Sequence, residues 1–193
     1  MRVRNSAVAV LLFAGVVAIL CAGIATAQGP APRTTPVARP AARAMVHGNL
    51  LQVMRGILFP NSNVIFAAQS EDPATVKPDA EPTAATNPLA STYGGWQAVE
   101  NSSIALAEAA NLLTIPGRLC SNGRPVPVQN ADWAKFVQGL RDAGMAAYKA
   151  AQSKNQDAIV DVSDQVTTAC ANCHNVYREK TDAQGGMAAR CAK

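Results

Sequence analysis

The five residues Cys170-Ala171-Asn172-Cys173-His174 constrain this chain more than any other stretch. Two cysteines three positions apart, followed directly by a histidine, form the attachment signature of a c-type haem. In that chemistry the two thiols add across the vinyl groups of haem, and the adjacent imidazole becomes an axial ligand of the iron. On a helix, positions 170, 173 and 174 share one face because they are three and four residues apart. The motif predicts one covalent haem c on a helix, bonded to Cys170 and Cys173, with His174 on the iron.

Three other chemistries use similar cysteine spacings, and the sequence argues against each of them. A thioredoxin-type dithiol needs a βαβ setting, and no strand-like run lies beside the motif. A structural zinc ion needs four Cys or His ligands, whereas the chain has only His47 and His174 as histidines. A plain disulfide within the motif would leave His174 without a role.

Residues 1–27 have the pattern of a secretory signal peptide. Arg2 and Arg4 give a positive start, residues 7–24 are apolar, and residues 25–27 (Ala-Thr-Ala) match a cleavage site. A membrane anchor is the alternative because the apolar run has nearly spanning length. Small residues dilute the run, however, and the cleavage site follows it at once. We therefore expect export, cleavage of the signal peptide and no stable membrane association afterwards.

The five cysteines suggest a second covalent feature. Cys21 falls in the expected signal peptide, and Cys170 and Cys173 are assigned to haem, which leaves Cys120 and Cys191. In an oxidising compartment these two could form a disulfide. Such a bond would tie the C-terminal tail to the loop between the second and third expected helices. Two free thiols are the alternative.

Charge and composition exclude several functions. Loss of the signal peptide removes Arg2 and Arg4, so the net charge falls from +4 to +2, with 15 Lys and Arg against 13 Asp and Glu. A nearly neutral chain has no electrostatic footprint for nucleic acid. With two histidines and no nucleophile motif, the sequence shows no catalytic constellation outside the haem motif, and we do not expect an enzyme.

Apolar residues recur at helical spacing in four segments, at about residues 41–59, 93–115, 131–151 and 156–180. No segment alternates as a strand does. An all-α fold, an antiparallel four-helix bundle with covalently bound haem filling part of its core, is the economical solution.

Between these segments the sequence predicts breaks and loops. Pro60 should break or kink the first helix. Residues 70–91 carry four prolines and should form a long surface loop that is either functional or disordered. Residues 28–40 should form a flexible leader. Gly144, in the third helix, marks either the close approach of another helix or of haem, or a tolerated glycine.

This layout resembles the class II c-type cytochromes, the cytochrome c′ family. The resemblance rests on the signal peptide, the four helices, and the motif on the last helix followed by Tyr177-Arg178. In class I cytochromes c the motif lies near the N-terminus and a methionine ligand lies far downstream, which does not suit a motif so close to the C-terminus. The Pro60 break, the 70–91 loop, and Cys120 and Cys191 depart from the family pattern.

The resemblance implies a cytochrome c′-like four-helix haem domain over residues 41–193, in a protein of the bacterial periplasm. It implies that His174 is the proximal ligand and that the first helix meets the other face of the haem. Some members of the family fill that position with methionine and transfer electrons to redox partner proteins. Others leave it empty and bind small gases such as NO and CO. Members often form homodimers.

The position opposite His174 decides between these two functions. If the first and last helices are antiparallel, a group facing His174 should lie near residues 47–52. His47 and Met54 bracket this window, and they are about 10 Å apart along a helix, so only one of them could reach the iron. The sequence leaves three alternatives: Met54, which has the more apolar neighbours, no protein ligand, or His47.

Arginines could pair with the haem propionates, since guanidinium groups bind carboxylates well. Arg55 and Arg178 are the candidates, although either could equally be a solvated surface residue.

Overall fold

The computed structural model describes residues 44–193, and this part of the chain is all-α. No β-strand occurs among these residues; Leu119 and Pro125 form only an isolated bridge. None of the described helices is long and apolar enough to cross a membrane. The expected signal peptide (1–27) and leader (28–40) lie outside the described residues.

The first helical path begins at Leu50 rather than at residue 41. Helix α1 (Leu50–Val53) starts at Asn49, whose side chain accepts a hydrogen bond from Gln52 N at 2.9 Å. The Gln52 side chain accepts one from Asn49 N in return, which makes a capping box. The expected boundary was too early because apolar spacing does not reveal a polar cap. His47 therefore precedes the helix and does not belong to its apolar face.

Pro60 bends the helical path but does not end it. A π-helical turn (Met54–Leu58) leads directly into helix α2 (Phe59–Ala67), which contains Pro60 in its first turn. Proline has no N–H to donate, and its ring clashes with the carbonyl four residues earlier in a regular α-helix. The wider turn relieves this conflict, since Phe59 N–H donates to the carbonyl of Met54, five residues back.

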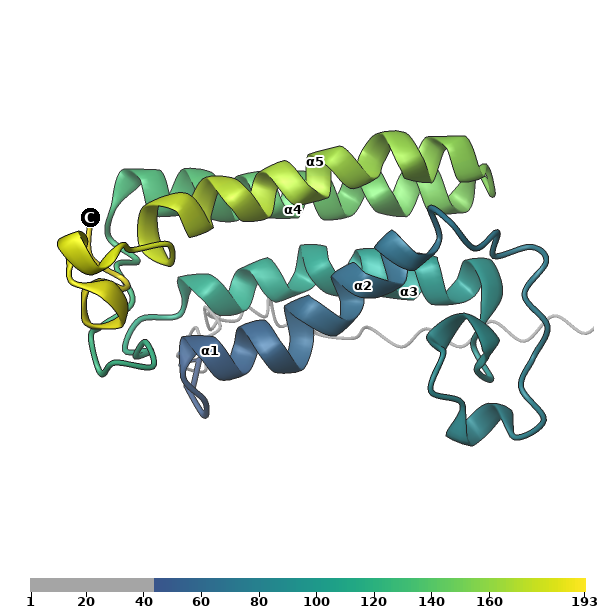
Figure 1. Ribbon diagram of the computed structural model, residues 1–193, viewed down its shortest axis with the longest axis horizontal. Coiled ribbons are helices and arrows are strands. Elements are labelled where there is room, and N and C mark those ends of the chain that lie inside the picture. The colour runs from purple at the N-terminus through teal and green to yellow at the C-terminus, as the bar shows by residue number, and fades with distance from the viewer. Residues whose placement is uncertain (1–43) are drawn as a thin grey trace, which may run out of the picture. The chain divides into compact units, whose positions relative to one another are not determined.

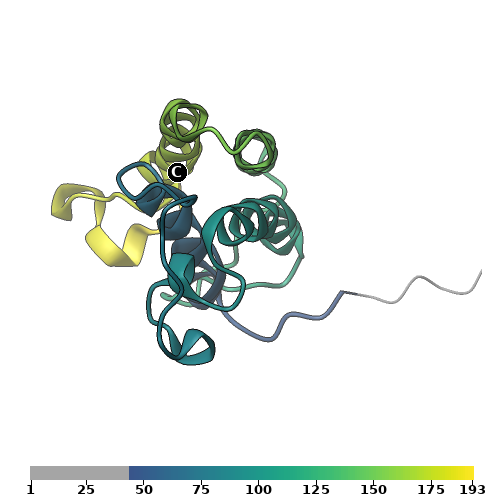
Figure 2. The same ribbon diagram turned by 90° about the vertical axis from the view of Figure 1, so that its right-hand side faces the viewer.

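Three longer helices follow, close to their expected positions. They are α3 (Gly95–Ala109), continued by a 3₁₀ turn (Ala110–Thr114), then α4 (Ala131–Gln152) and α5 (Gln156–Tyr177). Helix α4 packs against both α3 and α5, and α2 packs against α3 and α5 (Figures 1 and 2). The largest fully buried side chains come from all of these helices and from the long loop: Ile65, Leu89, Val99, Leu106, Trp133, Ile159 and Val166.

The proline-rich segment 70–91 is an ordered loop. It contains two 3₁₀ turns, Pro82–Ala84 and Pro88–Ala90. Backbone hydrogen bonds tie it together, from Asp79 N to Ala90 O at 2.9 Å and from Thr92 N to Pro82 O at 3.1 Å. Leu89 anchors it, since this side chain is only 1% exposed.

Gly144 marks the close approach of α4 to α3. A Cβ atom at this position would lie 2.8 Å from Ala107 N and 3.1 Å from Ala107 Cα. Gly139, five residues earlier on the same helix, has no atom within 4 Å of its equivalent position. The sequence left open whether a helix or haem lies against Gly144. Among the described residues, the neighbour of Gly144 is helix α3.

This pair of glycines gives a matched test of the packing. Gly144→Ala should destabilise the fold by about 1–3 kcal/mol because the new methyl group meets rigid backbone. Gly139→Ala should stabilise it by about 0.5–1 kcal/mol because alanine favours the helix and the site is open. Urea unfolding of both variants checks the prediction, and equal effects would contradict the close contact.

Candidate functional site

Helix α5 places the Cys-x-x-Cys-His motif in its last two turns. The helix starts at Asn155, whose side chain accepts a hydrogen bond from Asp157 N at 2.9 Å. Its buried stripe runs towards the motif through Ile159, Val162, Val166 and Ala169. The motif is therefore helical, as expected, and its two cysteines and histidine share one face.

A mainly apolar cavity of about 70 Å³ lies beside the motif. Cys173 and His174 line one side of it, and Met54 from the start of the π-helical turn lines it as well. The remaining lining residues come from α1, α4, the end of α5, the 118–126 loop and the C-terminal tail: Leu50, Leu51, Cys120, Ser121, Trp133, Tyr177, Arg178, Arg190 and Cys191. The cavity thus brings together the motif and the segment expected to face it.

The structure separates the candidates for the position opposite His174. Met54 lines the cavity with His174 and is partly buried against the core. His47 is exposed, lies before α1 and is not among the lining residues. Cys170 is half-buried but does not line the cavity. Of the two sequence-derived arginine candidates, Arg178 lines the cavity, whereas Arg55 is exposed and does not.

Burial keeps the cysteine thiols of the motif protonated. Cys170 and Cys173 are not disulfide-bonded. Burial raises the pKa of the Cys170 thiol, and burial together with the neighbouring Cys170 raises the pKa of Cys173 to about 12. Thiol–disulfide exchange needs a thiolate, which redox-active pairs favour through a lowered pKa. The surroundings of Cys170 and Cys173 raise both thiol pKa values and so disfavour the thiolate.

The surroundings of His174 favour its neutral imidazole form. Burial, followed by the nearby Arg178 charge, lowers the pKa of His174. Arg178 Nη1 lies 3.2 Å from His174 Nδ1. Because guanidinium only donates, Nδ1 must accept, which assigns the imidazole proton to Nε2. Coordination of a metal through Nε2 would require that proton to move to Nδ1 and Arg178 to leave that nitrogen.

Tyr177 forms a rigid support next to the motif. Its ring packs edge-on against Trp133, with centroids 5.2 Å apart. Its hydroxyl donates to Asp132 Oδ1 at 2.8 Å and accepts from Asn130 Nδ2 at 3.1 Å. Lys193 Nζ pairs with the other oxygen of Asp132 at 2.9 Å. These contacts tie the end of α5 to the start of α4.

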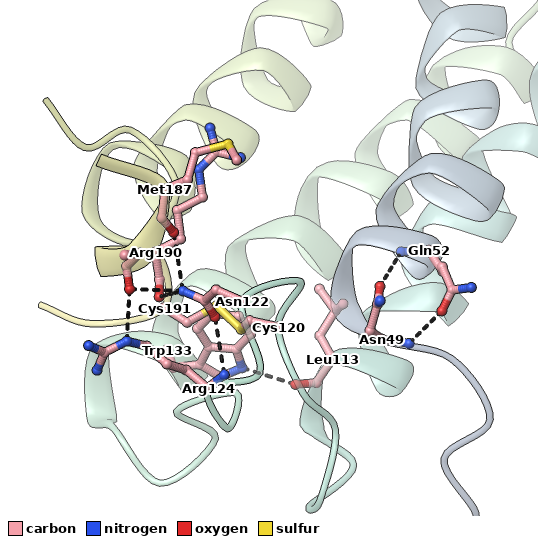
Figure 3. The surroundings of a disulfide bond; sticks show 11 residues. Asn49, Gln52, Leu113, Cys120, Asn122, Arg124, Trp133, Met187, Arg190 and Cys191 are labelled. Atoms are coloured by element: carbon pink, nitrogen blue, oxygen red, sulfur yellow. Dashed lines mark hydrogen bonds between the residues drawn. A yellow bond between two sulfur atoms is a disulfide. The ribbon is translucent and has the colours of Figure 1, made fainter. Parts of the chain in front are cut away.

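A loop over residues 118–126 holds the C-terminal tail against the cavity (Figure 3). Cys120 and Cys191 form the expected disulfide. Asn122 Nδ2 donates to the Arg190 carbonyl at 3.0 Å, and Arg124 Nε donates to the Ala188 carbonyl at 2.9 Å. These bonds fix the backbone of the tail on both sides of its arginine.

The same loop holds the start of α1. Leu50 N donates to the Leu119 carbonyl at 2.8 Å. Arg118 is only 4% exposed, and its guanidinium donates to the carbonyls of Leu112 and Gly48. Two walls of the cavity, α1 and the tail, therefore depend on one loop.

Arg190 is the cavity residue that the sequence argument missed. It lines the cavity, and its Nε atom is buried without a hydrogen-bond partner among the described residues. Sequence spacing gave no reason to place it near His174. The one available signal was that Arg190 precedes Cys191, because the expected disulfide to Cys120 would bring Arg190 close to the 118–126 loop.

The residues present suit a covalently attached haem. The thiols of Cys170 and Cys173 are not disulfide-bonded and share a helix face with the His174 imidazole. The Met54 thioether lines the same cavity as His174. The Arg190 side chain also lines it, and its unpartnered Nε could donate to a carboxylate. The cavity is only partly enclosed, so its volume sets no limit on a larger ring that extends out of it. Among residues 44–193, no cluster of three or more His, Cys, Asp or Glu side chains could hold a metal ion.

Comparisons with protein-family models, with curated proteins and with solved structures find no match to this chain. The functional argument accordingly rests on the residues and their geometry.

Removal of the disulfide tests how strongly the tail is held. The double variant Cys120→Ser/Cys191→Ser frees a loop that spans 71 residues. Loop-closure entropy predicts a loss of up to about 4 kcal/mol in the free energy of unfolding. Urea unfolding measures this loss, with reduced wild-type protein as the control. Unchanged stability would show that the hydrogen bonds of Asn122 and Arg124 suffice without the covalent bond.

Proposed function

We propose that this chain is an exported, periplasmic mono-haem c-type cytochrome of the cytochrome c′ type, whose helices form an antiparallel four-helix bundle. One observation carries the proposal: His174 and Met54 come from distant parts of the chain and line one apolar cavity, next to Cys173. A haem held there supplies one-electron chemistry at its iron. The proposed activity is electron transfer to redox partner proteins, without catalysis and without nucleic acid, in a monomer or a homodimer.

Cys170 and Cys173 would hold the group through two thioethers. Each S–H adds across a vinyl double bond, so a C–S and a C–H bond form, no atom is lost and no oxidant is needed. Both thiols must therefore be reduced when attachment occurs. The disulfide joins Cys120 and Cys191 instead, which leaves this pair free for attachment.

His174 and Met54 would hold the iron. Binding through His174 Nε2 would require its proton to move to Nδ1 and Arg178 to leave that nitrogen. Met54, the favoured second ligand, would supply a thioether that raises the reduction potential and closes the iron to other ligands. Leu50 and Leu51 beside Met54 give this part of the cavity an apolar lining.

A five-coordinate haem protein that binds NO or CO is the second candidate. It is favoured by the chemistry of the lining, because the apolar side chains of Leu50, Leu51 and Met54 would suit a small neutral gas. In that case Met54 would pack beside the gas without ligating the iron, a filling role that methionine performs well.

Mass spectrometry of the mature chain tests the attachment. In a bacterial host that has the attachment machinery, the exported wild-type chain should carry the mass of one haem on residues 170 and 173. Cys170→Ser/Cys173→Ser, the matched control, should carry none. An exported wild-type chain without added mass would refute the cytochrome function and favour a thiol–disulfide protein.

An optical spectrum tests Met54. Wild-type protein in the ferric state should be low-spin and show a sulfur-to-iron charge-transfer band. Met54→Leu removes the thioether and keeps the volume, so the band should vanish and CO should bind the ferrous protein. His47→Ala, an exposed control, should leave the spectrum unchanged. A high-spin wild-type spectrum that changes strongly on adding CO would instead establish the gas-binding candidate.

A further inference from the structure

We propose that Arg190 is a binding residue for a haem carboxylate, held at the cavity by the Cys120–Cys191 disulfide and the 118–126 loop. This inference rests on the proposed function and extends it to the C-terminal tail. Its starting point is the Arg190 Nε atom, which is buried and has no hydrogen-bond partner among the described residues.

An unpartnered buried donor on a charged group is unfavourable. Arginine stays protonated in proteins, so it cannot escape the penalty by losing its charge. Leaving a charged donor unsatisfied costs more than leaving a neutral one. Trp96 Nε1 is the other unpartnered buried side-chain atom among residues 44–193, but it is neutral and does not line the cavity. Arg190 is therefore the position where a missing anionic partner would matter most.

No carboxylate of the described chain neutralises Arg190. The two ion pairs found there join Arg178 to Glu179 and Lys193 to Asp132. Arg178 Nε is thus already engaged by Glu179 at 2.6 Å. Arg190 differs from Arg178 in this respect, because its charge has no counterpart in the protein.

The peptide group that follows the Arg190 side chain is fixed. Asn122 Nδ2 donates to its carbonyl at 3.0 Å, and Cys191 N donates to the Tyr177 carbonyl at 2.8 Å (Figure 3). The disulfide at the next residue adds a covalent restraint. A guanidinium held this way loses little further freedom on binding, which favours a carboxylate over water.

A porphyrin with two carboxylates matches this site in both place and charge. The Arg190 side chain lines the same cavity as Cys173 and His174, so a group bonded to that motif would share the cavity with it. Other carboxylates have the same chemistry, and the test below separates them from the porphyrin by esterification.

The first measurement uses the haem-loaded protein. Arg190→Gln should lower the reduction potential, because a positive charge near the haem favours the reduced state, and Arg190→Lys should restore part of the shift. Arg141→Gln is the matched control: it also loses one positive charge and a side-chain contact, to Asn111, but Arg141 lies on α4, holds no part of the tail and does not line the cavity. Its potential should stay near that of the wild type.

The second measurement removes the covalent links. The full chain carrying Cys170→Ser/Cys173→Ser is titrated with iron-free mesoporphyrin and with its dimethyl ester. The free acid should bind about tenfold more tightly than the ester, as one charge-assisted hydrogen bond predicts. Arg190→Gln should abolish this preference. In the unliganded chain the same substitution should leave urea stability unchanged or raise it, whereas a purely structural arginine would lower it.

The outcomes distinguish this inference from the function on which it rests. Suppose that haem is attached to the wild type, but Arg190→Gln changes neither the reduction potential of the loaded protein nor the preference of the cysteine-free chain for the free acid. The inference is then wrong and the cytochrome function stands. A wild-type chain without haem overturns the function. If neither porphyrin then binds the titrated chain, the role of Arg190 is overturned as well.

Discussion

The candidate site depends on one short loop that joins parts of the chain far apart in sequence. Residues 118–126 bond covalently to the tail at Cys191 and hydrogen-bond to the backbone at Gly48 and Leu50. The face of α5 that carries the motif needs walls opposite it to form a cavity, and α1 and the tail are short segments with few contacts of their own. The loop supplies the restraint that these segments lack.

A buried arginine explains part of the loop's rigidity. Arg118 is almost fully buried, and its guanidinium donates hydrogen bonds to the backbone carbonyls of Leu112 and Gly48, which belong to two different segments. Charge-assisted hydrogen bonds of this kind offset the desolvation of the guanidinium and leave few alternative arrangements. The site thus contains three cationic side chains with different roles: Arg118 joins segments, Arg178 meets the imidazole and Glu179, and Arg190 has no partner in the chain.

The sequence predicted the helices well because their cause is local. The period of the apolar residues located α3, α4 and α5 within a few positions, and the motif itself singled out His174. The start of the first helix was wrong because its cap, Asn49 with Gln52, is polar and leaves no apolar signal. Arg190 was missed although it precedes Cys191, since its place depends on the disulfide and sequence gives no geometry for contacts between distant residues. Met54 was reached by counting residues from the expected ends of two helices, and both ends lie elsewhere in the structure, at Leu50 and Tyr177. Met54 lines the cavity with His174, and its ligation of iron stays a prediction.

The π-helical turn has a geometric consequence for the first helical path. One extra residue in a turn rotates everything before it by about 100° relative to an unbroken α-helix. The upstream half, with Leu50 and Met54, can therefore face the cavity while the downstream half buries Val64 and Ile65 in the core. The π-helical turn that accommodates Pro60 thus lets one helical path present two differently oriented surfaces, one to the cavity through Met54 and one to the core.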